Sequence, residues 1–439
     1  MSTRTVNSDR SPECARSVVT PAPRHGWRAW CIVYALCVLL AVVVGTLCVL
    51  FLWSLDAATL LHQRRPQLLF LLPPAGLAVG LVYHRWGANV ERGTNLVLDR
   101  IHEPGAGLPV RIVPMVLIGT VITHLFGGSA GREGTAVQIG GGVAGGFLRR
   151  FGRVSIEHQR LVLMAGVAAG FGGVFGTPAA GAIFAIEVTR RWKHAPQAAI
   201  PCMIGAFIAD RVCIMLGATH VHYHIAFDRM HMQPWDFMLL GRVALAGICF
   251  GLAARLFSWT LHRAQDLFKA WIIRPYVRPL VGGVGVIGLA LIFGADCLGL
   301  GVTNIDPSIV TISSSFQPGG AGWWHWLLKI IFTAMTVGSG FKGGEVTPLF
   351  YVGSTLGHAL ANVLHAPIDL FAGLGLVAVF AAAARTPVAC TVLAVELFGF
   401  GHAADIVLYS VACILACASG GRTGIYQQHP APAALPRAL

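Results

Sequence analysis

Two carboxylates stand in glycine-rich breaks of an otherwise apolar chain. Glu133 lies in GGSAGREGTAVQIGGG, residues 127–142, and Glu345 lies in GSGFKGGEVTPLFYVG, residues 338–353. A carboxylate in apolar surroundings is costly unless it lines a polar cavity, so both acids are candidates for a functional site. The glycines around them free backbone N–H groups, and such groups at a helix N-terminus attract anions. The pair predicts an anion pathway controlled by carboxylates.

The elements that hold these breaks must lie in a membrane. Of the 439 residues, 55% are hydrophobic and only 12% are charged, whereas a soluble domain carries about 25% charged residues. Several apolar runs are too short to cross a hydrocarbon core of about 30 Å, and others are interrupted by Gly or Pro. Irregular backbone survives at that depth only where protein or water covers it. We therefore predict an all-α polytopic membrane protein with broken helices.

The basic residues fit a membrane topology better than a nucleic-acid surface. The formal net charge is +13, but Lys and Arg are scattered at the ends of apolar segments. The run 31–53 is longer than the apolar core of a signal peptide, so we expect a retained first span. Basic residues favour the cytoplasmic side. We expect a multi-pass protein of the plasma membrane, the inner membrane of a prokaryote, with a cytoplasmic N-terminus, because arginines precede that span: Arg4, Arg10, Arg16, Arg24 and Arg28.

One motif occurs twice along the chain. The segment 173–188 matches the segment 381–397, and both contain Thr-Pro followed by a glutamate, Glu187 in the first and Glu396 in the second. The offset between the Thr-Pro pairs is 386 minus 177, or 209 residues. We expect the two glutamates to be structural residues or to line a vestibule.

The glycine-framed stretches repeat at nearly the same distance. Residues 131–135 match residues 344–348 at an offset of 213, which puts Glu133 opposite Val346 and not opposite Glu345. Two motifs that recur in order predict an internal duplication, as in transporters whose repeats meet through broken helices. The predicted divisions are an N-terminal tail at 1–29, a first membrane repeat at 30–218, a loop at 219–236, a second repeat at 237–426 and a C-terminal tail at 427–439.

Four separated motifs together resemble one family. GREGT at 131–135, GGEVTP at 343–348, GIY at 424–426 and NLVLDRIHEP at 95–104 are similar to the anion-lining segments of the CLC family of chloride channels and proton-coupled antiporters. The similarity covers nearly all of residues 30–426. It implies a CLC-type fold of two related, inverted halves around a central anion pathway, and a homodimer with one pathway in each subunit.

The resemblance also implies roles for single residues. Glu133 takes the place of the family's gate, a carboxylate that occupies the pathway when deprotonated and swings away when protonated. Tyr426 takes the place of a tyrosine that donates a hydrogen bond to the central anion. Plainer roles stay open: Glu133 as a partner of the helix dipole, contributing about 0.3–1 kcal/mol, and Tyr426 as an interface aromatic. The other predicted anion-binding residues are Thr94, Asn95, Gly131, Arg132, Gly134, Val346, Thr347 and Tyr351.

Three departures from the common chloride members point to a branch of the family. The first loop reads RGTNL at 92–96 where a serine is usual, the second helix begins with Glu345 in place of an apolar residue, and Val188 replaces an internal glutamate. Together these departures resemble the fluoride/proton antiporter branch, in which GFKGGEVTPLF is characteristic. That branch often has Met or Asn near position 94, so Thr94 departs from it as well.

Fluoride is small and strongly hydrated, so a site that selects it must offer strong, close donors. Thr347 supplies a hydroxyl, and Thr94 and Asn95 supply side-chain donors. Tyr351 follows Thr347 by about one helical turn, which places both on the same helix face. These residues predict a site richer in donors than a chloride site.

Glu345 is the candidate for a second proton-carrying acid. Val188 cannot bind a proton, so proton coupling needs another titratable group, and Glu345 is the nearest one in the motifs. The alternative is a first-turn acid paired with Lys342, three residues earlier. Lys342 could instead raise the local anion concentration, as a basic vestibule does.

The leading hypothesis is an antiporter that exports fluoride in exchange for protons, with fluoride or chloride, protons and membrane lipid as partners and no nucleic acid. A passive chloride channel and a chloride/proton exchanger are the alternatives. An enzyme is disfavoured because the zinc-protease motif HExxH is absent. No cofactor or metal is predicted, although the run HVHYH leaves open a metal site without defined geometry at His220, His222 and His224.

Overall fold

The computed structural model describes residues 26–87, 90–104, 107–151, 154–190, 195–221, 223–227, 236–399 and 403–426. Within these ranges the chain is helical, and its only strand-like pairing is an isolated bridge between Gly131 and Gly344. The predicted all-α fold is confirmed. Most of both predicted tails, and His222, lie outside the described residues.

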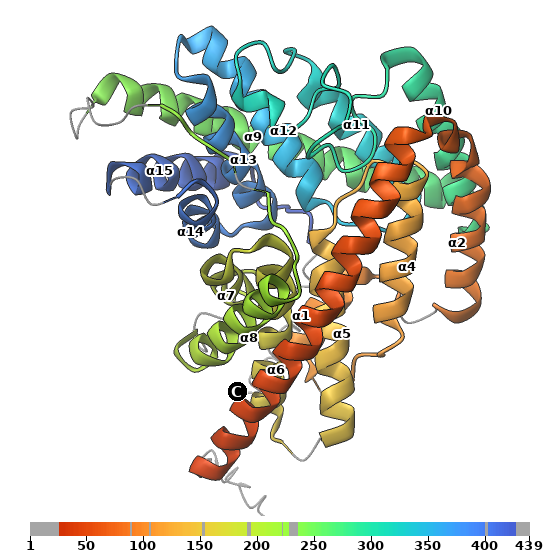
Figure 1. The fold of residues 1–439 in the computed structure, drawn as a ribbon, viewed down its shortest axis with the longest axis vertical. Helices are drawn as coiled ribbons and strands as arrows, with labels where there is room; N and C mark the ends of the chain where they lie inside the picture. Colours follow the sequence, from red (N-terminus) through yellow and green to blue (C-terminus); the bar gives the residue numbers. More distant parts are fainter. Residues whose placement is uncertain are drawn as a thin grey trace, which may run out of the picture.

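In the described part of the chain, eight α-helices precede the loop that was predicted to divide the repeats (Figure 1). The first, α1, packs along α8, α6 and α4, and crosses one side of the molecule in Figure 1. Their bounds are α1 Trp27–Arg64, α2 Leu72–Trp86, α3 Gly93–His102, α4 Ile112–Leu125, α5 Glu133–Phe151, α6 Ile156–Phe175, α7 Pro178–Glu187 and α8 Ala195–Met215.

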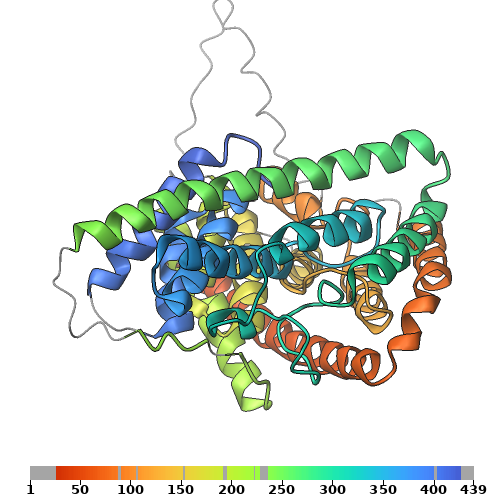
Figure 2. The ribbon, with the colours of Figure 1, turned by 90° about the horizontal axis from the view of Figure 1, so that it is seen from above.

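Seven helices follow, and the longest of them, α9, runs across the width of the molecule in Figure 2. Short 3-10 turns occur at Pro66–Leu71, Pro275–Val277 and Ser314–Phe316. The helices are α9 Phe237–Trp271, α10 Arg278–Phe293, α11 His325–Gly338, α12 Val346–Leu364, α13 Ile368–Ala384, α14 Pro387–Phe398 and α15 Ala403–Ser419.

Long and short apolar helices are mixed, as the interrupted apolar runs predicted. Five helical segments of the described chain are long and apolar enough to cross a membrane: Trp27–Arg64, Pro66–Trp86, Ala195–Met215, Phe237–Trp271 and Pro275–Phe293. Others are too short, among them α7 with 10 residues and α14 with 12. A helix of about 20 residues is needed to span the hydrocarbon core. The short helices therefore end inside the protein, where packing must cover their free backbone groups.

The helix order α5–α8 recurs as α12–α15. Helix α5 begins at Glu133 and α12 begins at Val346, and helices α7 and α14 both begin at the proline of a Thr-Pro pair. The two pairs of helix starts are 213 and 209 residues apart, the same offsets as those between the repeated motifs in the sequence.

Glycine pairs at equivalent positions join neighbouring helices in each half. A Cβ atom on Gly140 of α5 would lie 1.9 Å from the carbonyl oxygen of Gly166 of α6. In the other half, a Cβ atom on Gly353 of α12 would lie 2.1 Å from the carbonyl oxygen of Gly375 of α13. Small residues let helix backbones approach this closely in membrane proteins. The same close crossing thus occurs twice.

Glu187 and Glu396 cap each other's helices. The Glu187 carboxylate, at the end of α7, accepts hydrogen bonds from the N–H groups of Val388 at 3.1 Å and Ala389 at 2.7 Å, at the start of α14. The Glu396 carboxylate accepts two from the first turn of α7, at 2.9 and 2.8 Å. Each acid satisfies N–H groups that have no partner within their own helix.

This exchange fixes the relative direction of the two helices. Since each carboxylate near the end of one helix meets the start of the other, α7 and α14 run antiparallel. Matching helices of the two halves therefore point in opposite directions, as inverted repeats require. Of the two roles expected for the glutamates, the structural one is observed.

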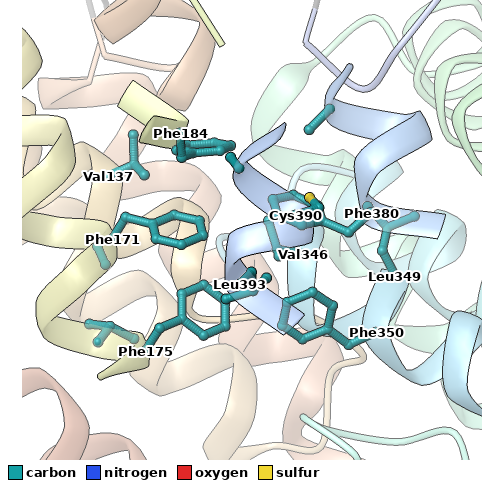
Figure 3. Close-up of a cluster of buried hydrophobic side chains, with 14 of the residues drawn as sticks. Val137, Phe171, Phe175, Phe184, Val346, Leu349, Phe350, Phe380, Cys390 and Leu393 are labelled. Atoms are coloured by element: carbon teal, nitrogen blue, oxygen red, sulfur yellow. The ribbon is translucent and has the colours of Figure 1, made fainter. Parts of the chain in front are cut away.

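Aromatic side chains fill the contact between the halves. Figure 3 shows Phe171, Phe175 and Phe184 from the first half facing Phe350 and Phe380 from the second. The ring centroids are 4.5 Å apart for Phe171 and Phe184 and 5.4 Å apart for Phe175 and Phe350. Such ring pairs stabilise a packed core by more than the burial of their apolar area alone would. The halves thus form one core beside the helix starts.

Candidate functional site

The two glycine-rich breaks meet and pair with each other. Gly131 and Gly344 exchange two backbone hydrogen bonds with N···O distances of 2.6 and 2.7 Å. A Cβ atom on Gly131 would lie 2.9 Å from the Thr347 hydroxyl oxygen, and one on Gly344 would lie 2.7 Å from the Gly134 nitrogen. Glycine is required at both positions because a side chain on either residue would push the two paired backbone segments apart. The pairing brings the N-termini of α5 and α12 together.

The Glu133 carboxylate lies at the start of α12, the helix of the other half. Its Oε2 atom accepts hydrogen bonds from the Thr347 hydroxyl at 2.5 Å, from the Thr347 backbone N–H at 3.0 Å and from the Arg132 backbone N–H at 3.2 Å. The residue is 1% exposed. Donors of this kind, with the positive end of a helix dipole, form an anion site. The carboxylate therefore occupies the place that a free anion would take.

Arg132 adds a positive charge beside the carboxylate. Its Nε atom lies 3.5 Å from Glu133 Oε1, and both side chains are largely buried. A buried carboxylate needs such partners, because leaving it uncompensated costs several kcal/mol. One guanidinium group and three hydrogen-bond donors thus stabilise the Glu133 carboxylate.

A cavity of about 350 Å³ lies next to this site. Its walls come from α2, α3, α4, α5, α9, α10 and α11, together with the segment before α12 and the residues after α15. Among its lining residues are Thr94, Asn95, Gln138, Lys342, Glu345 and Tyr426. The structure therefore gathers predicted site residues from three separate motifs around one space.

The Tyr426 hydroxyl has an open hydrogen-bonding capacity. The residue is 9% exposed, and its hydroxyl oxygen is buried without a hydrogen-bond partner in the described chain. A buried hydroxyl without a partner costs about 1–3 kcal/mol. Since this side chain lines the cavity, an anion in the cavity would accept a hydrogen bond from the Tyr426 hydroxyl.

Thr94 joins the first loop to the start of α5. Its hydroxyl donates to the Gly134 carbonyl at 3.4 Å and accepts from the Gln138 amide at 3.3 Å. The same amide donates to the Gly134 carbonyl at 3.1 Å. Thr94 and Asn95 both line the cavity, with Thr94 held in place by α5.

Gln138 is a residue that the sequence analysis missed. It extends the polar wall of the cavity one turn beyond Gly134. The sequence did contain a signal for it: Gln138 is the single amide in the glycine-rich stretch AVQIGGG. It follows Gly134 by four residues, the spacing that places two residues on the same face of a helix.

Glu345 faces the cavity and not the Glu133 site. It is the residue before α12, and no side-chain capping bond holds it there. Its Oε2 atom lies 3.7 Å from the place that a Cβ atom on Gly134 would take. Val346, 1% exposed, follows it as the first residue of α12. The two acids thus have different surroundings, with Glu133 at the start of α12 and Glu345 on the cavity wall.

Lys342 does not take the partner suggested by the sequence. Its ammonium lies 4.0 Å from the centroid of the Tyr83 ring, in place of an ion pair with Glu345. A cation over an aromatic face is stabilised by the ring. The helix-type pairing at three residues fails because residues 339–345 precede α12 and are not helical.

Tyr351 does not join the other predicted residues. It lies one turn after Thr347 on α12, but its hydroxyl donates to the carbonyl oxygens of Asp296 and Val310, both at 3.4 Å. Its ring faces the buried Lys329 ammonium, 5.0 Å from the ring centroid. These contacts hold the loop above α11 and α12, so the structure gives no support to an anion-binding role for Tyr351.

The middle residue of the histidine run, His222, lies outside the described residues, so the structure does not test a metal site there. No group of at least three His, Cys, Asp or Glu side chains there has the arrangement of metal ligands. His224 lines a separate cavity with Tyr223 and Asp369.

Comparison with known proteins identifies the family. The family model described as voltage gated chloride channel matches residues 75–421. A chloride/fluoride channel protein of Pseudomonas syringae pathovar tomato is 46% identical over 399 residues, covering 89% of this chain and 85% of the relative. The H(+)/Cl(-) exchange transporter ClcA of Vibrio cholerae is 29% identical over 332 residues, covering 72% of this chain and 69% of the relative.

Solved structures show the same fold. A crystal structure of a CLC-type fluoride/proton antiporter superposes with a TM-score of 0.82 at 31% identity, covering 90% of this chain and 97% of the other. A slow cyanobacterial Cl-/H+ antiporter superposes with a TM-score of 0.76 at 19% identity, covering 90% of this chain and 96% of the other, and supports the fold alone. With its paired helix starts, its antiparallel halves and these matches, the chain belongs to the CLC family of voltage-gated chloride channels and related antiporters.

Proposed function

We propose that this membrane protein exports fluoride in exchange for protons, with Glu133 as the gate. It is an ion transporter and not an enzyme. One observation carries the proposal: the Glu133 carboxylate sits on the Thr347 hydroxyl and N–H at the start of α12. A negatively charged side chain that occupies an anion site competes directly with any transported anion.

Protonation links the two ions. A protonated Glu133 loses its negative charge, so the three donors on Oε2 hold it less strongly. The donors then become available to a mobile anion. Since one set of donors serves either the carboxylate or the anion, binding of a proton and binding of an anion at this place favour each other.

The donors suit fluoride. Oε2 of Glu133 is held by a hydroxyl at 2.5 Å, and a strong, short O–H donor can replace water around a small, strongly hydrated ion. The Tyr426 hydroxyl adds a second O–H donor in the neighbouring cavity. The printed names of two relatives, a chloride/fluoride channel protein and a fluoride/proton antiporter, support the same choice.

Glu345 is proposed as the second proton-coupling acid. Val188 is apolar and 3% exposed, and its neighbour Glu187 is engaged in capping α14. Glu345 is instead free of a capping bond and lines the cavity. A proton that arrives through the cavity therefore meets Glu345 first.

The remaining proposals concern contacts and assembly. Thr94 and Asn95 form the wall on the α3 side, with Thr94 bonded to Gly134 of α5. Membrane lipid surrounds the exposed apolar helix faces. We place the repeats at 30–218 and 237–426 around the loop at 219–236, and the protein in the inner membrane of a prokaryote as a homodimer. Exposed apolar side chains of α8, among them Ile200, Met203 and Ile214, offer a face to lipid or to a second copy.

A passive chloride channel is the second candidate, because Val188 leaves the internal proton position apolar. Purified protein in liposomes loaded with sodium fluoride or sodium chloride distinguishes the two, with an ion electrode outside and pH recorded at the same time. We expect fluoride efflux that exceeds chloride efflux and is accompanied by proton uptake. Equal fluxes of both anions, or fluoride flux without proton movement, would overturn the antiport proposal.

A further inference from the structure

We propose that His124 is a positioning residue for the gate. Its ring holds the turn before α5 in place, so that the Arg132 N–H and the Glu133 carboxylate stay aligned with the start of α12. The proposal rests on the proposed function, in which Glu133 is the gate, and adds a residue that does not touch the anion. It starts from a histidine near the end of α4 that is only 1% exposed.

The His124 ring joins α4 to the glycine-rich break before α5. Its Nδ1 atom lies 2.8 Å from the Thr120 carbonyl oxygen, in the same helix, and its Nε2 atom lies 3.0 Å from the Ala130 carbonyl oxygen. Carbonyl oxygens only accept hydrogen bonds, so the ring must be the donor. The Thr120 carbonyl already faces the helical N–H of the residue four positions later. The contact with Ala130 is therefore the one that needs the ring.

The Ala130 carbonyl depends on this contact. Ala130 is fully buried, and it packs against the second break, since a Cβ atom on Gly343 would lie 2.5 Å from the Ala130 Cβ atom. In the described ranges its carbonyl oxygen accepts no backbone hydrogen bond. A buried carbonyl without a donor is costly. A ring with its proton on Nε2 supplies the donor whether it is neutral or doubly protonated, so the contact is a fixed attachment and not a pH switch.

The attachment lies directly before the groups that hold the gate closed. The next residue, Gly131, exchanges backbone hydrogen bonds with Gly344. The Arg132 N–H then donates to Glu133 Oε2 at 3.2 Å, and Arg132 Nε lies 3.5 Å from Oε1. Because the backbone has only two soft dihedrals per residue, a shift of Ala130 would move these donors with it. His124 thus acts on the gate through the backbone.

Helix α11 holds the same turn from a second direction. The Ser129 N–H donates to the Thr336 hydroxyl at 3.1 Å, and the Ser129 hydroxyl lies 3.1 Å from the Thr333 hydroxyl. The turn is therefore fixed between α4 and α11, with His124 as its side-chain bond to α4. A functional group keeps its geometry only if the residues that support it are themselves held by packing and hydrogen bonds.

The equivalent positions of the second half cannot form this attachment. The offset of 213 residues puts Val337 opposite His124 and Gly343 opposite Ala130. A valine side chain has no hydrogen-bond donor. The second break presents fixed donors, whereas the first carries Glu133, the side chain that must leave and return. The histidine is thus found in the half whose break carries the moving gate.

The test is transport in liposomes, with proton uptake and fluoride efflux recorded together. His124→Leu removes the donor and keeps a side chain of similar bulk. If the Arg132 N–H no longer reaches Glu133 Oε2, the closed position is weakened about tenfold, the equivalent of one hydrogen bond to a charged group. Fluoride then passes more often without protonation of the gate. We expect the ratio of protons to fluoride to fall about twofold or more.

Two amide variants separate the bond to Ala130 from the bulk of the ring. A glutamine can place its NH2 group near the position of Nε2 and donate to the Ala130 carbonyl, whereas an asparagine reaches only the position of Nδ1. We expect His124→Gln to retain the wild-type ratio and His124→Asn to behave as His124→Leu. Should His124→Leu fail to fold, the amide pair carries the test, because its members differ by one methylene group.

His358 provides the matched control. It is also 1% exposed, and its Nδ1 atom lies 2.9 Å from the Ser315 carbonyl oxygen. It stands on α12 about 18 Å along the helix from Val346. We expect His358→Leu to lower Tm and to leave the ratio of protons to fluoride unchanged. A lower ratio in this control would overturn the proposal, because loss of any buried histidine would then uncouple the ions.

The outcomes separate this proposal from the proposed function. A wild-type ratio in His124→Leu and His124→Asn would overturn the positioning role, even if the wild type exports fluoride in exchange for protons. A His124→Gln variant as uncoupled as His124→Leu would also overturn it, because the donor would then not matter. If the wild type exchanges chloride and not fluoride, the fluoride proposal fails, and a lower ratio of protons to chloride in His124→Leu still supports the positioning role. If the wild type moves both anions without protons, the gate and its positioning residue fail together.

Discussion

Replacing Glu133 by glutamine should uncouple anion movement from protons. Oε2 of Glu133 accepts three hydrogen bonds, two from Thr347 and one from Arg132. A hydrogen bond to a charged group contributes about 1.5–3 kcal/mol and a neutral one about 0.5–1.5 kcal/mol. With about 1 kcal/mol lost per bond, Glu133→Gln weakens the closed position by roughly 3 kcal/mol, or about a hundredfold.

The assay is the transport measurement in liposomes, with fluoride efflux and proton uptake recorded together. We expect fluoride efflux to continue in Glu133→Gln, while proton uptake stops and the flux loses its dependence on pH. A ratio of protons to fluoride equal to that of the wild type would refute the role of Glu133 as the gate.

Glu187→Gln is the matched control for this prediction. Glu187 is also a buried carboxylate with backbone partners, but it caps α14 and does not touch the helix starts at the gate. We expect this variant to retain the proton ratio and to lower the free energy of unfolding by about 2–4 kcal/mol, because one charge-assisted bond becomes neutral and the other is lost: the NH2 group that replaces one oxygen cannot accept from a backbone N–H. If Glu187→Gln also loses the wild-type ratio of protons to fluoride, the uncoupling in Glu133→Gln reflects general damage to the protein.

Three further substitutions test single contacts. Thr347→Val removes the hydroxyl that donates to Glu133 and should lower the ratio of fluoride to chloride flux about tenfold or more, whereas Thr347→Ser should not; an unchanged ratio would exclude the hydroxyl as a selector. Tyr426→Phe removes a hydroxyl without a partner, so Tm should stay the same or rise while the apparent KM for fluoride increases; a large fall in Tm would reveal a structural bond instead. Gly353→Ala places a Cβ atom 2.1 Å from the Gly375 carbonyl oxygen and should strongly reduce Tm in a thermal melt, and a wild-type Tm would contradict the close helix crossing.

The sequence was most informative where local chemistry is distinctive. The glycine-rich breaks predicted helix N-termini close to Glu133 and Glu345, and helices α5 and α12 begin at Glu133 and Val346. The offset between these positions also predicted that Glu133 and Glu345 are not equivalent. The structure agrees, since Glu133 binds to Thr347 whereas Glu345 lines the cavity.

Side-chain direction was not predictable in the same way. Spacing along an α-helix put Tyr351 on the face of Thr347, but the loop of Asp296 and Val310 draws the Tyr351 hydroxyl away. Lys342 was considered as a partner of Glu345 on a helical spacing, yet the segment is not a helix and the lysine faces Tyr83. In both cases a partner distant in sequence decided the contact.

The amino-acid sequence by itself determined the class of protein, the two breaks and the residues able to carry charge, because composition and glycine placement act within a few residues of the chain. Only the tertiary structure decided which groups meet. Glu133 and the Thr347 donors are 214 residues apart and come together because the halves pack antiparallel and pair at Gly131 and Gly344. The site exists only where the two halves join, so neither break contains it alone.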